Sequence, residues 1–221
     1  FNLGYSENGP LQELAILKEF SKEIKFSKVI WFYYESNDLD DISSGLKNDI
    51  LRKYFSDQNF SQQLIQNVEK SDRLYEQILS KQLEEKVIKF HSTNFNYKYF
   101  LKLSYLRKFF FKKNQNAEIL NFKKIIKQAN QLTKDNNAEF YFVYLPDFFR
   151  YYYNQEKNQK FYNYFRVMNV IKELGIKNID INNEVFSKHK NKLNFFPFGS
   201  FGHYNELGYE AVARKVNEKI Y

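Results

Sequence analysis

Short apolar runs alternate with amphipathic segments along this chain. Residues 29–34 (Val-Ile-Trp-Phe-Tyr-Tyr) and 139–145 (Glu-Phe-Tyr-Phe-Val-Tyr-Leu) are apolar and aromatic almost throughout, and each run predicts a strand that is buried on both faces. Pro146 ends the second run. A third, shorter strand is expected over residues 176–181, directly after Gly175.

Amphipathic helices separate and follow these strands. Apolar residues recur at intervals of three and four in four segments, residues 11–24, 117–134, 160–174 and 207–220. Pro10 suits the first turn of a helix, and Asn136-Asn137 is expected to stop the second helix. Helices that alternate with short buried strands predict an α/β fold with a parallel sheet. Ligands bind such sheets at the carboxyl ends of the strands, so the loops after Leu3, Tyr34, Leu145 and Ile181 are expected to carry the chemistry.

The segment from about residue 45 to residue 113 departs from this alternation. It shows helical periodicity almost continuously and contains no Pro. The preceding residues 35–44 are rich in Asp and Ser and are expected to form a loop. We therefore predict a single α/β domain over residues 1–221, with an all-helical insertion at about 45–113.

Composition excludes several kinds of site. The 221 residues contain no Cys, which excludes disulfides, a thiol nucleophile and a Cys-ligated metal. His91 and His189 have no His or carboxylate partner at ligand spacing, so we expect neither a metal nor another cofactor. The apolar runs are far shorter than the roughly 20 residues of a membrane-spanning helix. The sequence leaves the compartment open.

The net charge of +8 is concentrated in one segment. No acidic residue lies between Lys86 and Ala117, and the basic residues there equal the whole excess: Lys86, Lys89, Lys98, Lys102, Arg107, Lys108, Lys112 and Lys113. One interpretation is a solvated helix face opposite a buried aromatic stripe. Another is contact of the Lys86–Lys113 segment with an anionic surface, such as acidic lipid or polysaccharide. No nucleic-acid motif accompanies the segment, so nucleic acid is not an expected partner.

Two of the loops contain residue types suited to acyl transfer. Asn37 follows the first predicted strand, where its amide N–H groups can stabilise an oxyanion. His203 lies on a glycine-punctuated loop that leads into the last helix, a position that suits a general base. Each residue also has a plain structural interpretation, Asn37 as part of a helix cap and His203 as a surface residue.

Taken in order, three stretches resemble the SGNH (GDSL-type) hydrolases. They are Asn2-Leu-Gly-Tyr-Ser-Glu-Asn-Gly-Pro-Leu11, Trp31-Phe-Tyr-Tyr-Glu-Ser-Asn-Asp-Leu39 and Gly202-His-Tyr-Asn-Glu-Leu-Gly-Tyr209. The likeness covers nearly the whole chain and is closest to a bacterial subgroup with a helical insertion after the Asn loop. It implies a flavodoxin-like three-layer α/β/α fold and a serine nucleophile that forms an acyl-enzyme. Members cleave esters, thioesters or O-acetyl groups on lipids, sugars and peptidoglycan.

Carried over by position, the resemblance implies a role for each of several residues. His203 would be the general base, Asn37 the side-chain oxyanion donor and the backbone N–H of Glu7 a second donor. Ser36 stands where the family has Gly before the Asn. Ser200 stands three residues before His203, where the family has Asp. The acid of the triad would then come from elsewhere, with Asp180 as a candidate, or the histidine would be oriented by a backbone carbonyl in a Ser–His dyad.

The Gly-Asp-Ser block that carries the family's nucleophile would precede Asn2 and has no counterpart in the sequence. We therefore expect an inactive fragment that lacks the central strand, from a parent that supplies the serine and acts on a small ester or an O-acylated saccharide or lipid. The alternative is a non-catalytic carbohydrate- or envelope-binding module, favoured by the absent Ser and by Ser200. A third possibility is a peripheral binder that uses the basic segment.

Overall fold

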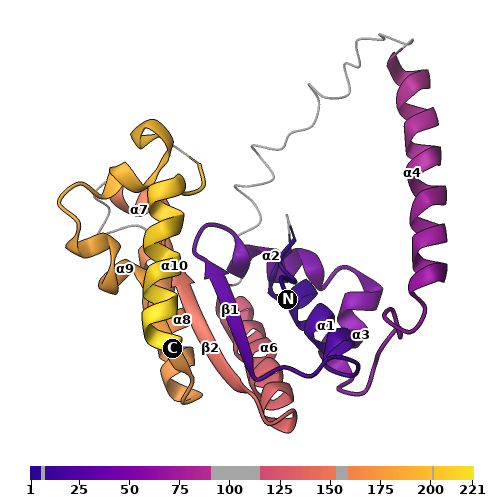
Figure 1. Ribbon diagram of the computed structural model, residues 1–221, viewed down its shortest axis with the longest axis horizontal. Coiled ribbons are helices and arrows are strands. Elements are labelled where there is room, and N and C mark those ends of the chain that lie inside the picture. Colours follow the sequence, from indigo (N-terminus) through magenta and orange to yellow (C-terminus); the bar gives the residue numbers. More distant parts are fainter. Residues whose placement is uncertain (6–7, 91–114, 153–158, 201) are drawn as a thin grey trace. The chain divides into compact units, whose positions relative to one another are not determined.

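The computed structural model divides into two compact units (Figure 1). One consists of residues 1–61 and 116–221, and the other of residues 62–115. The first is an α/β unit built on a parallel sheet, and the second contains helix α4 (Val68–Phe90). The structure describes residues 1–5, 8–90, 115–152, 159–200 and 202–221.

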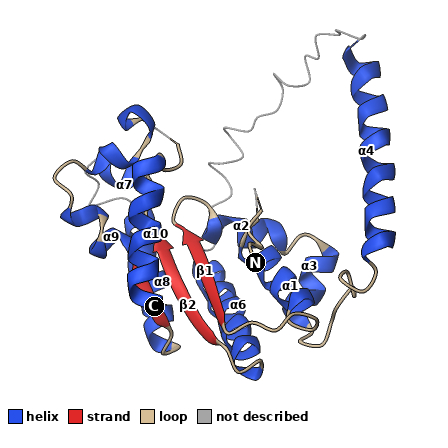
Figure 2. Cartoon of the chain, in the orientation of Figure 1, coloured by secondary structure: helices blue, strands red, loops and turns tan. Residues whose placement is uncertain are grey.

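The sheet of the α/β unit has three parallel strands in sequential order (Figure 2). They are β1 (Lys28–Tyr34), β2 (Glu139–Leu145) and β3 (Lys177–Asp180). The register of β1 on β2 runs from Lys28 opposite Glu139 to Tyr34 opposite Leu145. The predicted α/β class, the parallel sheet and the positions of the three strands are therefore confirmed.

Side chains of the sheet alternate between two hydrophobic cores, one on each face. Trp31, Tyr33 and Phe142 belong to the core that packs against α1 (Pro10–Phe20), α6 (Gln115–Asp135) and α8 (Gln159–Glu173). Tyr141 and Val143 belong to the other core, which packs against α10 (Glu206–Ile220) and the short helical turns before it. This alternation is the two-residue period of a strand, and it explains why β1 and β2 are apolar without interruption after their first residues.

The ends of these helices follow the local backbone preferences. Pro10 is the first residue of α1, where its missing N–H costs no hydrogen bond. Asn137 follows α6 with φ 57°, and Gly175 follows α8 with φ 63°. Asn and Gly tolerate this left-handed conformation better than other residues, so both helices stop where the sequence predicts.

The expectation of a loop over residues 35–44 was wrong, because α2 (Asp38–Gly45) forms there. Its first turn contains three aspartates, and carboxylates at a helix N-terminus are stabilised by the helix dipole. Leu39 and Ile42 are buried, three residues apart on one helix face. The Asp-rich composition therefore marks the start of a helix.

The expected insertion at about 45–113 is described only in part. Helix α3 (Asp49–Ser56) contacts α1, and the Lys18 Nζ donates a hydrogen bond of 2.7 Å to the backbone oxygen of the buried Tyr54. This helix therefore belongs to the α/β unit. Residues 57–67 are not helical. Residues 91–114, which contain most of the basic segment, lie outside the described residues.

No helix in the described part of the chain combines the length and apolar character that crossing a bilayer requires.

A pair of substitutions on α6 tests the core assignment. Phe122 is fully buried and its ring contacts Tyr33 with centroids 5.4 Å apart, whereas Leu120 on the same helix is 67% exposed. We expect Phe122→Ala to lower the free energy of unfolding by about 3–5 kcal/mol and Leu120→Ala by about 0.5 kcal/mol or less. Urea denaturation followed by circular dichroism measures both. Similar losses for the two variants would contradict the assignment.

Candidate functional site

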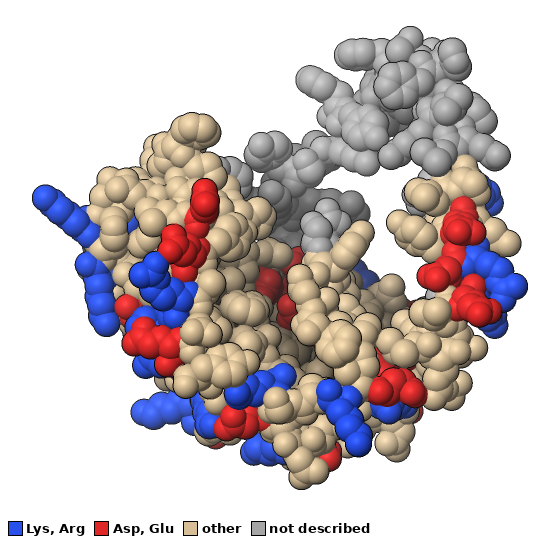
Figure 3. Space-filling view, viewed as in Figure 1, with Lys and Arg blue, Asp and Glu red and all other residues tan. Residues whose placement is uncertain are grey.

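An acidic residue follows or ends each strand at the carboxyl edge of the sheet. Glu35 directly follows β1, Asp147 lies two residues after β2 and Asp180 is the last residue of β3. All three are buried, with 9%, 2% and 7% of their surface exposed. Because the strands are parallel, the three carboxylates lie along the same edge. Figure 3 shows one face of the α/β unit hollowed near its middle, with acidic side chains in the hollow.

Glu35 forms a buried ion pair with Arg150, which belongs to α7 (Phe149–Tyr152). The Arg150 Nε donates to Glu35 Oε2 at 2.8 Å, and Nη2 donates to Oε1. The backbone N–H of Asp147 also donates to Glu35 Oε2, at 3.0 Å. Burial by itself lowers the pKa of Arg150, but the hydrogen bonds and charge of Glu35 raise it above its ordinary value. The pair ties the loop after β1 to the turn after β2.

Tyr34 connects the ends of the same two strands through its side chain. Its phenol donates to Asp147 Oδ1 at 3.2 Å. Burial, followed by the charge and hydrogen bond of Asp147, raises the pKa of Tyr34 above its ordinary value. The phenol therefore stays protonated and remains a donor at neutral pH.

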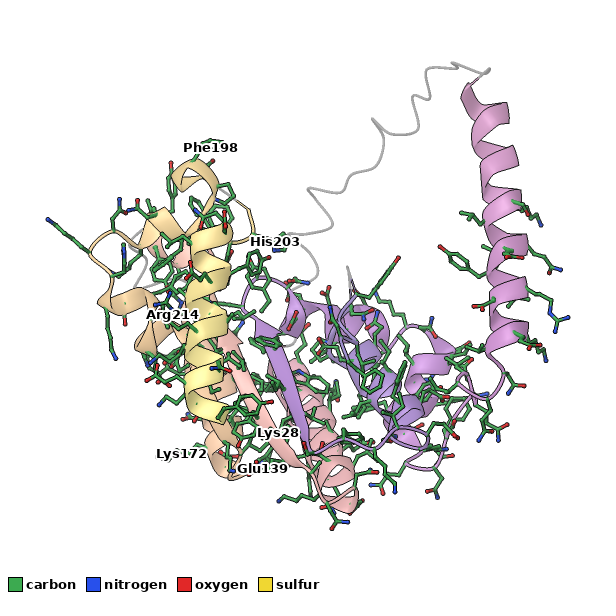
Figure 4. All side chains as sticks on the ribbon, viewed as in Figure 1. Lys28, Glu139, Lys172, Phe198, His203 and Arg214 are labelled. Carbon is green, nitrogen blue, oxygen red and sulfur yellow. The ribbon has the colours of Figure 1, made fainter. Side chains whose placement is uncertain are left out.

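The imidazole of His203 lies against the Tyr34 ring, with centroids 5.7 Å apart and an angle of 41° between the planes. His203 is exposed and lies three residues before the start of α10. Figure 4 shows it beyond the carboxyl end of β1, whereas Lys28 and Glu139 lie at the amino ends of their strands. The structure therefore brings His203 to the edge of the sheet where sequence analysis expected it.

The loop that carries His203 is held by Asn205 and Gly208. The Asn205 side chain accepts a hydrogen bond from the Gly208 N–H at 3.0 Å and donates to the backbone oxygens of Asn194 and Phe196. A Cβ added to Gly208 would lie 2.6 Å from the backbone oxygen of Phe195 and 2.8 Å from the Tyr204 Cβ. The Asn and Gly of the His-Tyr-Asn-Glu-Leu-Gly stretch thus fix the path of the chain at the start of α10.

Asn37 is exposed at the N-cap of α2, three residues after Tyr34. Its side-chain Nδ2 donates to Asp41 Oδ2 at 2.5 Å. Asp41 is itself confined, because a Cβ added to Gly9 would lie only 2.6 Å from the Asp41 Cβ. The amide of Asn37 is therefore oriented by its own helix, and an amide nitrogen carries a second N–H for another acceptor.

Asp38 and Glu13 form a buried pair of carboxyl groups between α2 and α1. Burial raises the pKa of Asp38 from 3.8 to about 8. A hydrogen bond of 2.8 Å from the Tyr34 N–H opposes this rise, and the charge of Asp41 adds to it. Burial, and then the charge of Asp38, raises the pKa of Glu13 well above its ordinary value. These two groups therefore favour their protonated forms.

The other residues implied by the resemblance are placed differently. The Asp180 carboxylate accepts from Tyr164 at 2.5 Å and from the Asn183 side chain at 2.8 Å, and it forms no hydrogen bond or ion pair with His203 in the structure as described. Ser200 is exposed at the end of a short helical turn. Glu7 lies outside the described residues.

Sequence reasoning did not identify Tyr34, Asp147 or the Glu35–Arg150 pair as parts of the site. Tyr34, Glu35 and Asp147 lie at or just after strand ends, and this position was the available signal, because ligands of parallel sheets bind at this edge. Arg150 carried no comparable signal, because nothing in its local sequence indicates a buried partner more than a hundred residues away.

In the described ranges, no group of three or more His, Asp or Glu side chains is arranged to hold a metal ion. Comparisons with family models, with curated proteins and with solved structures find no match to this chain.

The buried ion pair predicts a large effect of removing one partner. We expect Glu35→Gln to lower the free energy of unfolding by about 3–5 kcal/mol, because the Arg150 guanidinium would stay buried without its carboxylate. The matched control is Glu139→Gln. The ion pair of Glu139 with Lys177 is half exposed and should contribute under about 1 kcal/mol to the free energy of unfolding. Urea denaturation of both variants measures the difference. Equal losses would show that the buried pair has no special role.

The Asp38 carboxyl predicts a pH dependence of stability. The folded protein retains a proton that the unfolded chain releases above about pH 4, so stability should fall as the pH rises from about 4 to about 8. Asn at this position keeps an acceptor for the Tyr34 N–H and carries no charge.

We therefore expect Asp38→Asn to raise the melting temperature more at about pH 8 than at about pH 5. Glu13 still titrates in this variant, so some pH dependence should remain. Asp40→Asn, on the exposed side of α2, is the control and should not reproduce the effect. A gain for Asp38→Asn that is the same at both pH values would refute the prediction.

Proposed function

We propose that this protein is a serine-type ester hydrolase of the SGNH kind, with His203 as its general base and Asn37 as a donor to the oxyanion. The observation that carries the proposal is the contact between His203 and Tyr34. This contact brings the imidazole of His203 to the last residue of β1. Asn37 follows β1 by three residues. An imidazole and an amide at the carboxyl edge of a parallel sheet are two of the groups that acyl transfer needs.

In the proposed reaction, His203 accepts the proton of a serine hydroxyl as the serine oxygen attacks the ester carbonyl. The second amide N–H of Asn37 stabilises the negative charge that develops on the carbonyl oxygen. The bond to the alcohol breaks, and the alcohol leaves with the proton from His203. Water then attacks the acyl-enzyme in the same way and releases the acid.

The outer edge of β1 offers a place for the serine nucleophile in this proposal. Hydrogen bonds from Glu139 N–H to Ser27 and from Glu35 N–H to Leu145 direct the odd-numbered residues of β1 toward β2. The N–H and C=O groups of Ile30 and Phe32 therefore point away from β2, and no described strand pairs with them. A further parallel strand at this edge, as in a flavodoxin-like sheet, would end beside His203. We expect it to supply the serine.

Exposed aromatic rings on α7, on α10 and on the loop before His203 support the proposed substrate class. Tyr152 and Tyr209 are both more than half exposed, and Phe198 is fully exposed on the loop before His203. Such rings suit stacking on a sugar or contact with an acyl chain. The proposed substrate is a small ester or an O-acylated saccharide or lipid.

A second candidate function is a carbohydrate- or envelope-binding module without catalysis. Two observations favour it. Ser200 replaces the family's acid, and the amide of Asn37 is already engaged by Asp41. In this role the same exposed aromatic rings would bind the ligand, and His203 would be dispensable.

Labelling of the full-length natural polypeptide with a fluorophosphonate probe separates the two functions. A hydrolase should be labelled at a serine, and His203→Ala should slow labelling by at least about a hundredfold. Asn37→Ala should slow ester hydrolysis by about 10²–10³-fold, because it removes one oxyanion donor. The matched control is His189→Ala, a loop histidine whose Nδ1 lies 2.8 Å from the backbone oxygen of Asn191.

Absence of labelling, or labelling that His203→Ala and His189→Ala change equally, would refute the hydrolase. Saccharide binding that persists in His203→Ala would then favour the binding module.

A further inference from the structure

Tyr34 is held at both ends by the carboxyl groups of aspartates. Its backbone N–H donates to Asp38 Oδ2 at 2.8 Å, and its phenol donates to Asp147 Oδ1 at 3.2 Å. Asp38 and Asp147 are only 5% and 2% exposed. One edge of β1 is also paired with β2 along the full length of β1, up to Tyr34 opposite Leu145. The Tyr34 ring is therefore a fixed surface at the carboxyl end of β1.

His203 has few other restraints. Within the described residues its imidazole makes no hydrogen bond or ion pair, and its ring contact is the one with Tyr34. The chain on its C-terminal side is anchored. Tyr204, the next residue, is buried and its phenol donates to the Pro146 backbone oxygen at 2.6 Å. The backbone of the loop thus brings His203 to the Tyr34 ring, and the ring is what the imidazole packs against.

We propose that Tyr34 is the positioning residue of His203 and that Asp147 acts on the histidine through the Tyr34 phenol. This inference rests on the proposed hydrolase function and assigns the part of the triad that sequence analysis left open. Asp147 would take the role for which Ser200 lacks a carboxylate and for which Asp180 is engaged elsewhere.

The chemistry of the two rings supports this role. When His203 accepts the serine proton it becomes a cation, and cations are attracted to aromatic rings whose centroids lie within about 6 Å. A phenol that donates to a carboxylate has a more electron-rich ring, so the Asp147 charge reaches the imidazolium through Tyr34. The neighbouring charged and titratable groups are Glu35, whose charge is neutralised by Arg150, and the phenol of Tyr209.

Nuclear magnetic resonance of the full-length chain tests the positioning directly. We expect nuclear Overhauser effects between the imidazole C–H protons of His203 and the ring protons of Tyr34 in the unaltered protein. Tyr34→Leu should abolish the ring-current shift of the His203 signals, whereas Tyr34→Phe should retain it. The control, Tyr152→Leu, removes a ring that stacks on Phe148 at the same edge and should leave the His203 signals unchanged. Absence of the Overhauser effects in the unaltered protein would overturn the inference even if Tyr34→Leu fails to fold.

Kinetics of the same variants test the catalytic consequence. Tyr34→Leu should lower kcat about two- to fivefold with little change in KM, the size expected for an exposed cation–π contact that forms only when His203 is charged. Tyr34→Phe and Asp147→Asn should each give a smaller decrease in kcat, because the ring remains and only its coupling to the carboxylate is lost. An unchanged kcat in Tyr34→Leu would overturn the inference. Failure of fluorophosphonate labelling, with the Overhauser effects present, would instead defeat the hydrolase and leave the contact established.

Discussion

The buried ion pair between Glu35 and Arg150 is the interaction on which the arrangement of this edge of the sheet depends. Glu35 continues β1, Arg150 lies in the helix after β2, and the same carboxylate accepts the backbone N–H of Asp147. One carboxylate therefore sets the distance between two loops that are more than a hundred residues apart in sequence. A charge pair of this kind contributes little to stability compared with apolar packing, but it allows only one geometry. The hydrogen bond from Tyr34 to Asp147 joins the same two loops, and His203 packs against the Tyr34 ring.

The strands and most helices could be predicted because their signals are local. Residues 140–145 are apolar throughout and are followed by Pro146, and Gly175 marks the end of α8 by a conformation that few other residues accept. Helix α2 was missed because its three aspartates resemble a turn until the burial of Leu39 and Ile42 is known. The predicted helical insertion also included residues 57–67, which are not helical; most of them are Gln, Asn or Ser, and few apolar residues are available to bury one face of a helix.

The candidate site was predictable only in part, for a physical reason. His203 and Asn37 stand in recognisable local settings, a glycine-punctuated helix entrance and a strand end. Their partners do not, since the contacts of Tyr34 with Asp147 and of Glu35 with Arg150 join strands that meet only in the folded sheet. Pairing of distant polar groups depends on strand order and register, and the sequence of a single segment determines neither of them.

No strand in the described part of the chain pairs with the outer edge of β1, and this has a consequence for how the molecule behaves among copies of itself. An exposed row of amide and carbonyl groups on an aromatic strand is a template on which another chain can add a strand. Phe32, with 42% of its surface exposed, adds an apolar reason for such contact, and Lys28 supplies a charge only at the amino end. A strand that paired with this edge would therefore also protect the protein against aggregation.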